Sequence, residues 1–415
     1  MAPVTHTRGR RGGRFAFAAM GTIAVLGLAG CSLGDGEETE EPASETAAPV
    51  DAAPLLEEAL TDLAGYPALV ATGQVAGSVG ADVQETTLTV ADGGAAQGTF
   101  QVNGANAEVA VADSKLFLRA DEEFWLDRNV FGPDSDDFEG NWVRATTAQA
   151  GINPSSTLAP PALAEILGGM ELDDDNAVEE DLDGTRVYRI DLAGERNQVW
   201  VDAETNRLVR IAIEELVPEG AENGPQVRLD LAEADEAAVE ELYSGLTTAA
   251  EEELTNSRDA RVEAAWQADT GSLSCDEGPS CTWSGTVYDA GSNSSGTVLI
   301  RMDVTFSNDE LGTQECSESG SLEAGGTLDL SCGIDYNVTS SDPEDYNIDA
   351  DAVLSTRGLT SSQQEEMLAA LVEQKEATLS GGAEATEDGE GAEDGATTEQ
   401  TEGTEDGAEG AGGGE

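Results

Sequence analysis

Short segments in which apolar and polar residues alternate recur between residues 69 and 234, and they constrain the fold more than any other feature of the chain. In residues 185–192, for example, Tyr188, Ile190 and Leu192 fall on one face and the intervening side chains fall on the other. Successive side chains of a β-strand point to opposite sides of a sheet. The alternation therefore predicts an antiparallel sheet with one buried face and one solvated face.

Turn residues and two helical repeats divide this part of the chain. The predicted strands cover residues 83–90, 98–102, 108–111, 116–119, 185–192, 198–202, 207–214 and 227–231, with turns such as Asp92-Gly93-Gly94 between them. Phe124-Trp125 and residues 141–144 are expected to end strands. Apolar residues at helical spacing predict helices at 55–64 and 161–168. Residues 54–234 are therefore expected to be mainly β (α+β), with only two short helices to cover the apolar face of the sheet.

The chain beyond residue 234 divides into four further segments. Residues 235–266 return to helical spacing and are expected to form a helical connector between two domains. Short strands separated by turns predict a small β-sandwich at 267–358. A helix is expected at 359–378, and the acidic, glycine-rich residues 379–415 are expected to be disordered.

Four cysteines of the second region, Cys275, Cys281, Cys316 and Cys332, predict two disulfides in an exported protein. The first two flank a short turn, and the last two flank strands that a tight connection joins. We therefore expect Cys275 to pair with Cys281, and Cys316 with Cys332. A zinc site of four thiolates is the alternative, but the spacing lacks the paired Cys-x-x-Cys motifs of zinc ribbons. We expect no metal and no cofactor.

Residues 1–30 combine a basic head, an apolar stretch and small residues in front of Cys31. They contain four arginines and no acidic residue, and the apolar stretch runs from Phe15 to Leu28. This arrangement is typical of a cleaved secretory signal peptide, and the stretch is shorter than the ~20 residues of a membrane span. Leu28-Ala29-Gly30-Cys31 is similar to a bacterial lipobox. That similarity implies acylation of Cys31, for example with palmitate, and an anchor on the outer face of the cytoplasmic membrane.

The cleavage of the N-terminal region has an alternative, and the segment after Cys31 has a predicted state. An uncleaved N-terminal anchor is the alternative to a lipidated Cys31. Residues 31–53 lack apolar periodicity and are expected to form a disordered acidic linker.

The charge and the histidine content exclude several classes of function. Beyond residue 30 the chain has 15 basic and 84 acidic residues, and its one histidine, His6, lies within the predicted signal. Such an excess of carboxylates repels phosphate and argues against nucleic acid as a partner. Without histidine, serine–histidine and cysteine–histidine catalytic sites are excluded. We therefore expect no enzyme activity, although a glycosidase that uses two carboxylates stays open.

The acidity itself has two interpretations, and neither identifies a function. A high-salt habitat favours an acidic, lysine-poor body because salt screens the self-repulsion. A cationic partner would favour the same composition. The acidic turns 173–175 and 181–184 are expected to be solvated, with weak calcium binding as the alternative.

The pattern of strands and turns resembles the lipoprotein families of LprG/LppX and LolA type. The resemblance rests on residues 73–118, on Phe124-Trp125 and residues 140–143, and on residues 199–213 with a turn formed by Asp202, Thr205 and Arg207. It implies a curved antiparallel half-barrel sheet wrapped around helices, whose concave side holds acyl chains of lipids, lipoglycans or lipoproteins. No functional residue of those families maps onto this sequence one to one.

Two functions follow as hypotheses, and they differ in whether an apolar cavity lies between the sheet and its helices. The first is a lipid carrier, with cavity candidates on the apolar strand faces at Leu116, Leu118, Tyr188, Ile190, Ile211 and Ile213, next to Leu192 and Val209. The second is a non-catalytic cell-surface adaptor that binds a protein or an envelope polymer. A fully packed core, with no room for a ligand, would favour the adaptor.

Overall fold

The computed structural model describes residues 49–130, 137–275, 279–292, 294–338 and 345–387. The predicted signal peptide, the lipidation site at Cys31 and most of the linker lie outside the described residues, as does the tail beyond residue 387. In these ranges, every helix is too short or too polar to cross a bilayer.

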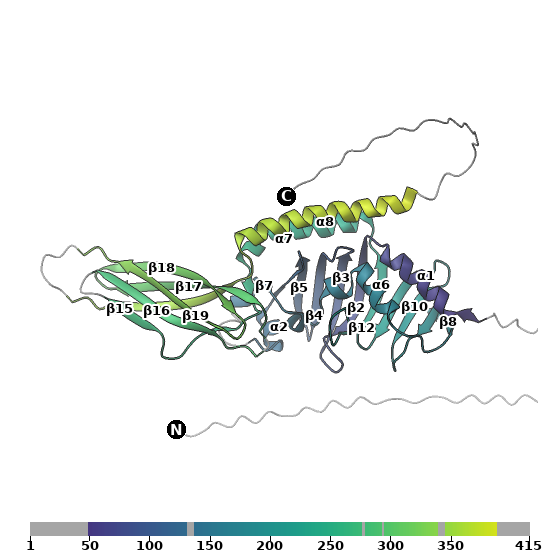
Figure 1. The fold of residues 1–415 in the computed structure, drawn as a ribbon, viewed down its shortest axis with the longest axis horizontal. Helices are drawn as coiled ribbons and strands as arrows, with labels where there is room; N and C mark the ends of the chain where they lie inside the picture. The colour runs from purple at the N-terminus through teal and green to yellow at the C-terminus, as the bar shows by residue number, and fades with distance from the viewer. Residues whose placement is uncertain (1–48, 131–136, 276–278, 293, 339–344, 388–415) are drawn as a thin grey trace, which may run out of the picture. The chain divides into compact units, whose positions relative to one another are not determined.

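An open sheet of thirteen strands forms the larger part of the fold (Figure 1). Its strands, in spatial order, are β1 (Val50–Asp51), β8 (Asn176–Leu182), β9 (Thr185–Asp191), β10 (Gln198–Asp202), β11 (Leu208–Ile213), β12 (Gln226–Glu233), β2 (Ala68–Ala76), β3 (Val83–Ala91), β4 (Ala96–Val102), β5 (Ala105–Ala112), β6 (Lys115–Ala120), β7 (Trp142–Arg144) and β13 (Arg258–Asp259). Neighbouring strands are antiparallel, except that β13 runs parallel to β7. The sheet is curved and does not close into a barrel, which confirms the predicted fold class.

The inner face of the sheet carries the main apolar core. Alternate residues of the strands, such as Leu88, Val109 and Leu229, are at most 1% exposed. They pack with the apolar sides of α1 (Ala52–Ala64) and α6 (Pro160–Gly168), the two helices expected from the helical spacing. The short helices α4 (Thr147–Ala150) and α5 (Pro154–Thr157) lie between β7 and α6 in the chain.

Two glycines on the inner face allow close approach of neighbouring strands. A Cβ atom at Gly73 of β2 would lie 2.3 Å from the backbone oxygen of Arg228, and one at Gly98 of β4 would lie 2.0 Å from the backbone oxygen of Thr87. Gly73 also has a φ of +146°, which side-chain-bearing residues rarely adopt. Glycines at such positions let a sheet bend, because no side chain crowds its concave side.

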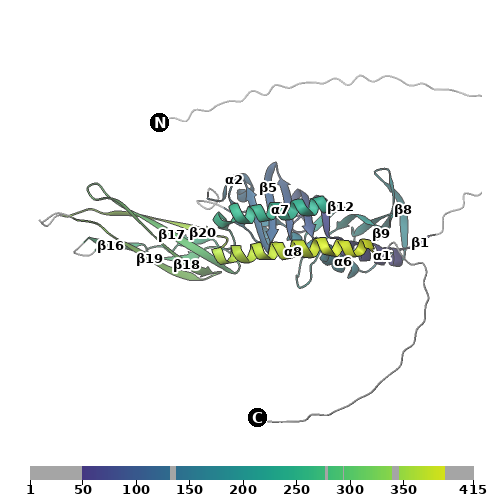
Figure 2. The same cartoon turned by 90° about the horizontal axis from the view of Figure 1, so that it is seen from above.

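Helices α7 (Glu236–Glu252) and α8 (Ser361–Glu387) lie side by side on the outer face (Figures 1 and 2). Under α7 the strands present small residues, which allow the helix to approach the sheet closely: Ala68, Ala91, Ala110 and Ala112. The apolar side of α7 fills this surface with Val239, Leu242, Tyr243 and Leu246. Farther from α7 the outer face is polar, as the alternation predicts.

Three expectations about the helical segments of the chain are wrong. Helix α7 does not run on to residue 266 as a connector, because the sheet buries its apolar side and the chain continues as η1 (Leu254–Asn256), β13 and β14 (Ala264–Trp266). Helix α8 passes the expected end at residue 378 and extends to Glu387. Phe124 and Trp125 lie in helix α2 (Glu122–Asp127) and not at a strand end, because the Asp121 carboxylate accepts the Phe124 N–H at 3.0 Å and caps the helix.

The second region consists of two packed sheets with a separate core. One sheet contains β14, β15 (Ser272–Cys275), β16 (Ser280–Asp289) and β19 (Thr327–Asp335), and the other contains β17 (Thr297–Asn308), β18 (Gly312–Glu323) and β20 (Asp349–Arg357). Val287 and Leu330 of the first sheet pack with Ile300, Met302 and Phe306 of the second. This arrangement is the small disulfide-bonded β-sandwich expected from the sequence.

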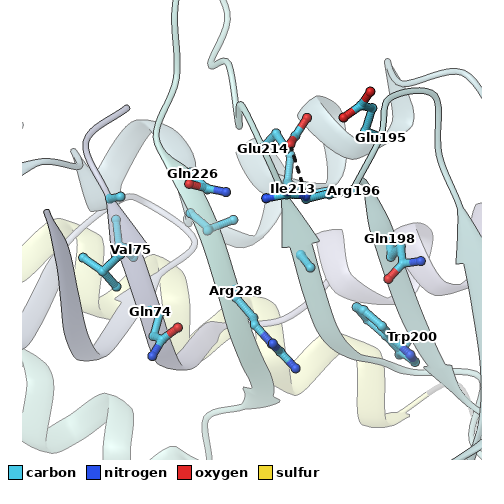
Figure 3. A pocket seen from close by; sticks show the side chains of 14 residues that line it. Gln74, Val75, Glu195, Arg196, Gln198, Trp200, Ile213, Glu214, Gln226 and Arg228 are labelled. Atoms are coloured by element: carbon cyan, nitrogen blue, oxygen red, sulfur yellow. Dashed lines mark ion pairs between the residues drawn. The ribbon is translucent and has the colours of Figure 1, made fainter. Parts of the chain in front are cut away.

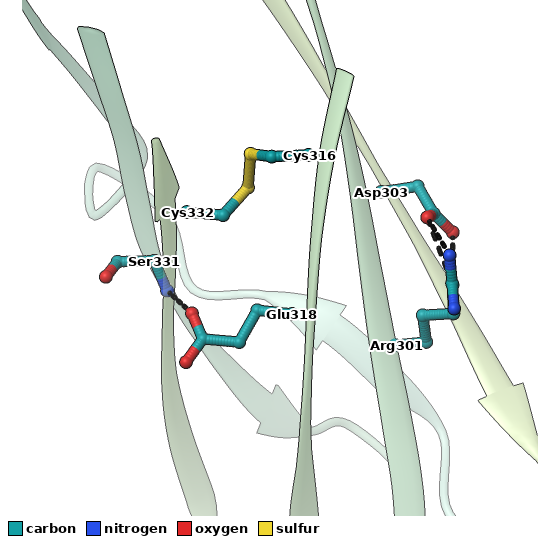
Figure 4. The surroundings of a disulfide bond; sticks show 6 residues. All are labelled: Arg301, Asp303, Cys316, Glu318, Ser331 and Cys332. Atoms are coloured by element: carbon teal, nitrogen blue, oxygen red, sulfur yellow. Dashed lines mark hydrogen bonds and ion pairs between the residues drawn. A yellow bond between two sulfur atoms is a disulfide. The ribbon is translucent and has the colours of Figure 1, made fainter. Parts of the chain in front are cut away.

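Both disulfides form in the pairing that the spacing predicts. Cys275 and Cys281 face each other across the hairpin of β15 and β16. Cys316 and Cys332 join β18 to β19, which belong to different sheets, with their Cα atoms 6.0 Å apart (Figure 4). Beside this bond the Glu318 carboxylate accepts the backbone N–H of Ser331 at 2.7 Å. The second disulfide therefore ties the two sheets of the sandwich together.

Candidate ligand-binding site

The six predicted cavity residues come together on the inner face of the curved sheet. Leu116, Leu118, Ile190, Ile211 and Ile213 are at most 6% exposed and belong to one apolar cluster, and Tyr188 is half-buried against it. In this arrangement the side chains pack in one core with the apolar sides of α1 and α6. A charge at Ile211 is therefore expected to unfold the protein, and a substitution there cannot separate ligand binding from stability.

Val209 departs from the predicted alternation with Ile211 and Ile213. A register shift between β10 and β11 pairs Trp200 with Arg210 and Val201 with Leu208, so Val209 is an extra residue on β11. As a result Leu208 takes the buried position, whereas Val209 is half-exposed in a surface groove.

One groove, which we name the α6 groove, lies directly over this core. It has a volume of about 720 Å³ and runs between α6 and the loop that connects β11 to β12. Its apolar lining comes from both elements: Ala162, Ile166, Met170, Val217 and Pro218. Three carboxylates line its edge, those of Glu165, Glu215 and Glu219. The residues adjoining this lining in the chain, Leu163, Leu167 and Leu216, are fully buried in the inner core.

A second groove, the rim groove, lies between the C-terminal end of α1, the ends of β11 and β12, and helices α7 and α8. Its volume is about 1140 Å³. The polar side chains here bind one another: Tyr66 donates to Asp62 at 2.9 Å, and Arg207 forms ion pairs with Asp62 at 3.5 Å and Glu233 at 2.8 Å. Burial raises the pKa of Tyr66, and the hydrogen bond to Asp62 raises it further. This cluster fastens α1 to the sheet and leaves few groups for a ligand.

A third groove, the outer-face groove, has a volume of about 450 Å³ and crosses β10, β11, β12 and β2 (Figure 3). Half of its fourteen lining residues are polar or charged, including Gln74, Gln198 and Arg228, and Trp200 lies among them. Of the six predicted cavity residues, only Ile213 adjoins this groove, at the end of β11. Its polar groups lie along the middle of the groove, whereas the α6 groove has apolar side chains from both elements, and this difference indicates a different kind of ligand.

Neither a metal site nor a catalytic constellation was predicted from the sequence. Within the described ranges, no three histidine, cysteine, aspartate or glutamate residues gather at a spacing suited to a metal ion.

The predictions from sequence did not include the loop that lines the α6 groove or the role of Arg228 in the outer-face groove. The run Leu216-Val217-Pro218 between acidic residues is a signal for the α6 groove, because a loop exposed to water rarely contains three consecutive apolar residues. Arg228 gives no signal of its own, because charged residues at alternate strand positions are ordinary on a solvated sheet face.

No family model matches the chain, and no curated protein matches it in sequence. Among solved structures, LprF from Mycobacterium bovis is similar over 45% of this chain and 95% of its own length, with 14% identity and a TM-score of 0.29. MucB in complex with MucA(peri) is similar over 64% of this chain and 92% of its own length, with 10% identity and a TM-score of 0.20. With TM-scores this low, neither similarity bears on function, and the fold is defined by the pairing of the strands in this chain.

Proposed function

We propose that this chain is a non-catalytic, lipid-anchored protein of the cell envelope that binds the apolar chain of a lipid or lipidated molecule beside α6. The observation that carries the proposal is the α6 groove. Its volume of about 720 Å³ falls within the range of small-ligand sites, roughly 300–1,000 Å³. Both walls contribute apolar side chains to its lining, and the neighbouring residues Leu163, Leu167 and Leu216 belong to the inner core.

Helix α6 is the element whose movement would extend the groove into the core. Its N-cap residue, Ala159, makes no side-chain hydrogen bond, and prolines occupy its first turn. The helix contacts the core through the buried side chains of Leu163, Ala164 and Leu167. An apolar chain that replaces these contacts exchanges one apolar surface for another, so the cost of opening is partly offset.

The carboxylates at the groove edge restrict the polar end of the ligand. Glu165, Glu215 and Glu219 are exposed and line the groove, and none of the three forms an ion pair with any of the described residues. A phosphate or a free carboxylate would meet like charge there, whereas an uncharged head would not. The proposed ligand is therefore an acyl chain with a neutral head, such as a glycan or a hydroxyl group.

The binding site is tested with a fluorescent fatty alcohol and the delipidated full chain. The variant Ile166→Glu places a charge in the half-exposed wall of the groove, and we expect it to weaken binding by about tenfold or more. Val372→Glu is the matched control, because Val372 is 55% exposed on α8 and is not among the residues that line the groove. Equal loss in both variants, or no binding by the wild-type chain, would refute the lipid site and favour the adaptor. A fatty acid of equal length is expected to bind less tightly than the alcohol.

The membrane anchor is tested separately at Cys31. The variant Cys31→Ser removes the one thiol near the predicted cleavage site, so we expect an uncut precursor or a released, unacylated protein. Unchanged processing together with unchanged membrane attachment would contradict the anchor, whatever the result at Ile166.

A further inference from the structure

The outer-face groove contains an arginine without a partner in a row of paired side chains. Cross-strand neighbours place Asp191, Gln198, Ala212, Arg228, Gln74 and Glu85 in one row across β9, β10, β11, β12, β2 and β3. Gln198 donates to Asp191 at 2.8 Å, and Gln74 donates to Glu85 at 2.8 Å. The side chain of Arg228, between them, forms no hydrogen bond or ion pair with any of the described residues.

The neighbouring arginines show that pairing is the rule on this face. Arg189 forms ion pairs with Glu180 and Asp191, and Arg210 forms ion pairs with Asp183 and Asp230. Arg228 extends away from the carboxylate of Glu214, as Figure 3 shows. Its guanidinium therefore keeps its donors free in a chain that otherwise has a large excess of carboxylates.

Ala212 makes room beside this arginine. It lies directly between Gln198 and Arg228 in the row, and its methyl group leaves the floor of the groove low. Gln198 and Arg228 are two strands apart, which corresponds to roughly 10 Å. Trp200 lies on the same side as Gln198 and faces the same hollow (Figure 3). The hollow is wide enough for one sugar ring.

The two glutamines add hydrogen-bond acceptors of known orientation. Each donates its amide N–H to a carboxylate, which fixes the direction of the amide group. Each amide oxygen is therefore left free to accept a hydrogen bond from a hydroxyl group. The groove thus offers two acceptors and one cationic donor.

We propose that the outer-face groove binds a uronic acid residue of an acidic glycan. The Arg228 guanidinium donates to the carboxylate of the sugar, and the Gln74 and Gln198 oxygens accept its hydroxyl groups. The charged residues of the lining are balanced, with Arg196 and Arg228 opposing Glu195 and Glu214, and Arg196 lies 3.8 Å from Glu214. At an ionic strength of about 0.15 M the more distant carboxylates are screened beyond about 8 Å. This site is independent of the proposed lipid site.

The site is tested by calorimetric titration of the full chain with trigalacturonic acid, with maltotriose as the uncharged comparison. We expect trigalacturonic acid to bind and maltotriose to bind at least tenfold less tightly. Arg228→Gln should weaken binding about tenfold or more, because the charge-assisted hydrogen bonds to the carboxylate are lost. Arg186→Gln is the matched control, since Arg186 is an exposed arginine of β9 that does not line the groove, and it should change affinity less than twofold.

Three results would overturn the proposal. Absence of binding by the wild-type chain is the first. Equal weakening by Arg228→Gln and Arg186→Gln is the second, because it would show a general effect of charge. The third is displacement of trigalacturonic acid by acetate at the same concentration. Acetate has a carboxylate but no hydroxyl groups, so this result would show that the glutamine oxygens contribute nothing to binding. Gln198→Leu provides a further check and should weaken trigalacturonic acid binding without changing the thermal stability of the chain.

Discussion

Asp259 shows how one buried charge is accommodated in an otherwise solvated set of carboxylates. It is 0% exposed, and its carboxylate binds the guanidinium of Arg261 through bonds of 2.6 and 3.0 Å. Its backbone N–H donates to the Thr356 hydroxyl at 2.8 Å, so a residue of β13 is bonded to a residue of β20. Burial raises the pKa of Asp259, and the pairing with Arg261 opposes this shift.

Removal of this carboxylate is expected to be costly. Asp259→Ala leaves Arg261 without its carboxylate partner, and we expect a loss of about 3–5 kcal/mol in the free energy of unfolding, measured by denaturant titration at neutral pH. Asp303→Ala is the control, because the Arg301–Asp303 pair is exposed and its loss should cost less than about 1 kcal/mol. Similar losses in both variants would show that burial of Asp259 has no special effect.

The pH dependence of the same comparison has a definite sign. The pKa of Asp259 in the folded state lies above its ordinary value of 3.8. The folded state therefore binds this proton more tightly than the unfolded state does. The resulting stabilisation is fully present below pH ~4 and is lost as the pH rises through the folded-state pKa. The stability margin of the wild-type chain over Asp259→Ala should be largest near pH 4 and smaller at neutral pH. A margin that grows with pH would contradict the raised pKa.

At the scale of the elements, Gly73 shapes β2 within the curved sheet. Alanine at this position would place a Cβ atom 2.3 Å from the backbone of β12 and would have to adopt a φ of +146°. We expect Gly73→Ala to lower the unfolding free energy by about 3 kcal/mol, or to prevent folding. Gly80→Ala is the control, because Gly80 has a φ of +86° but no atom near its missing Cβ, and about 1 kcal/mol is expected. Chemical denaturation measures the unfolding free energy of both variants. Equal losses would show that the positive φ alone, and not the contact with β12, explains the effect at Gly73.

The two disulfides are expected to differ in their contributions. Cys316 and Cys332 are 16 residues apart in sequence and join two sheets, whereas Cys275 and Cys281 are six residues apart within one hairpin. In the chain-entropy model a longer closed loop stabilises more, about 3 kcal/mol against about 2 kcal/mol. The double variant Cys316→Ser/Cys332→Ser should therefore unfold at lower denaturant concentration than Cys275→Ser/Cys281→Ser. The reverse order would show that the crosslink between the sheets is not the more stabilising of the two.

At the scale of the whole molecule, the excess of acidic residues makes stability depend on salt. Beyond residue 30 the acidic residues outnumber the basic ones by 84 to 15, and most ion pairs on the sheet are at least partly exposed to solvent. Raising the salt concentration from about 0.1 M to 1 M shortens the screening length from about 10 Å to 3 Å, which weakens the net self-repulsion. We expect the Tm to rise over this range. A constant or falling Tm would mean that exposed ion pairs contribute more than the repulsion, and would argue against a high-salt habitat as the reason for the acidity.

Much of the fold can be read from local patterns in the sequence. Period-two alternation predicted the strands of β9, β10 and β12, and helical spacing predicted α1 and α6, because each pattern is set by the geometry of a single element. The cysteine spacing predicted both disulfides for the same reason, since each pair is close along the chain. The apolar sides of β6, β9 and β11 were also identified, and five of the six candidate residues on them are buried together.

How these elements cover one another depends on contacts that form only in the folded chain. The apolar side of α7 was evident, but the sequence could not show that alanines from β2, β3 and β5 form the surface that buries it, because those residues are distant in the chain. Val209 was misplaced because a register shift depends on the partner strand. The α6 groove and the free guanidinium of Arg228 likewise depend on neighbouring elements that are distant in the chain. Each depends on which side chains of separate elements meet and which do not, and contacts of this kind are set by packing in three dimensions and not by local periodicity.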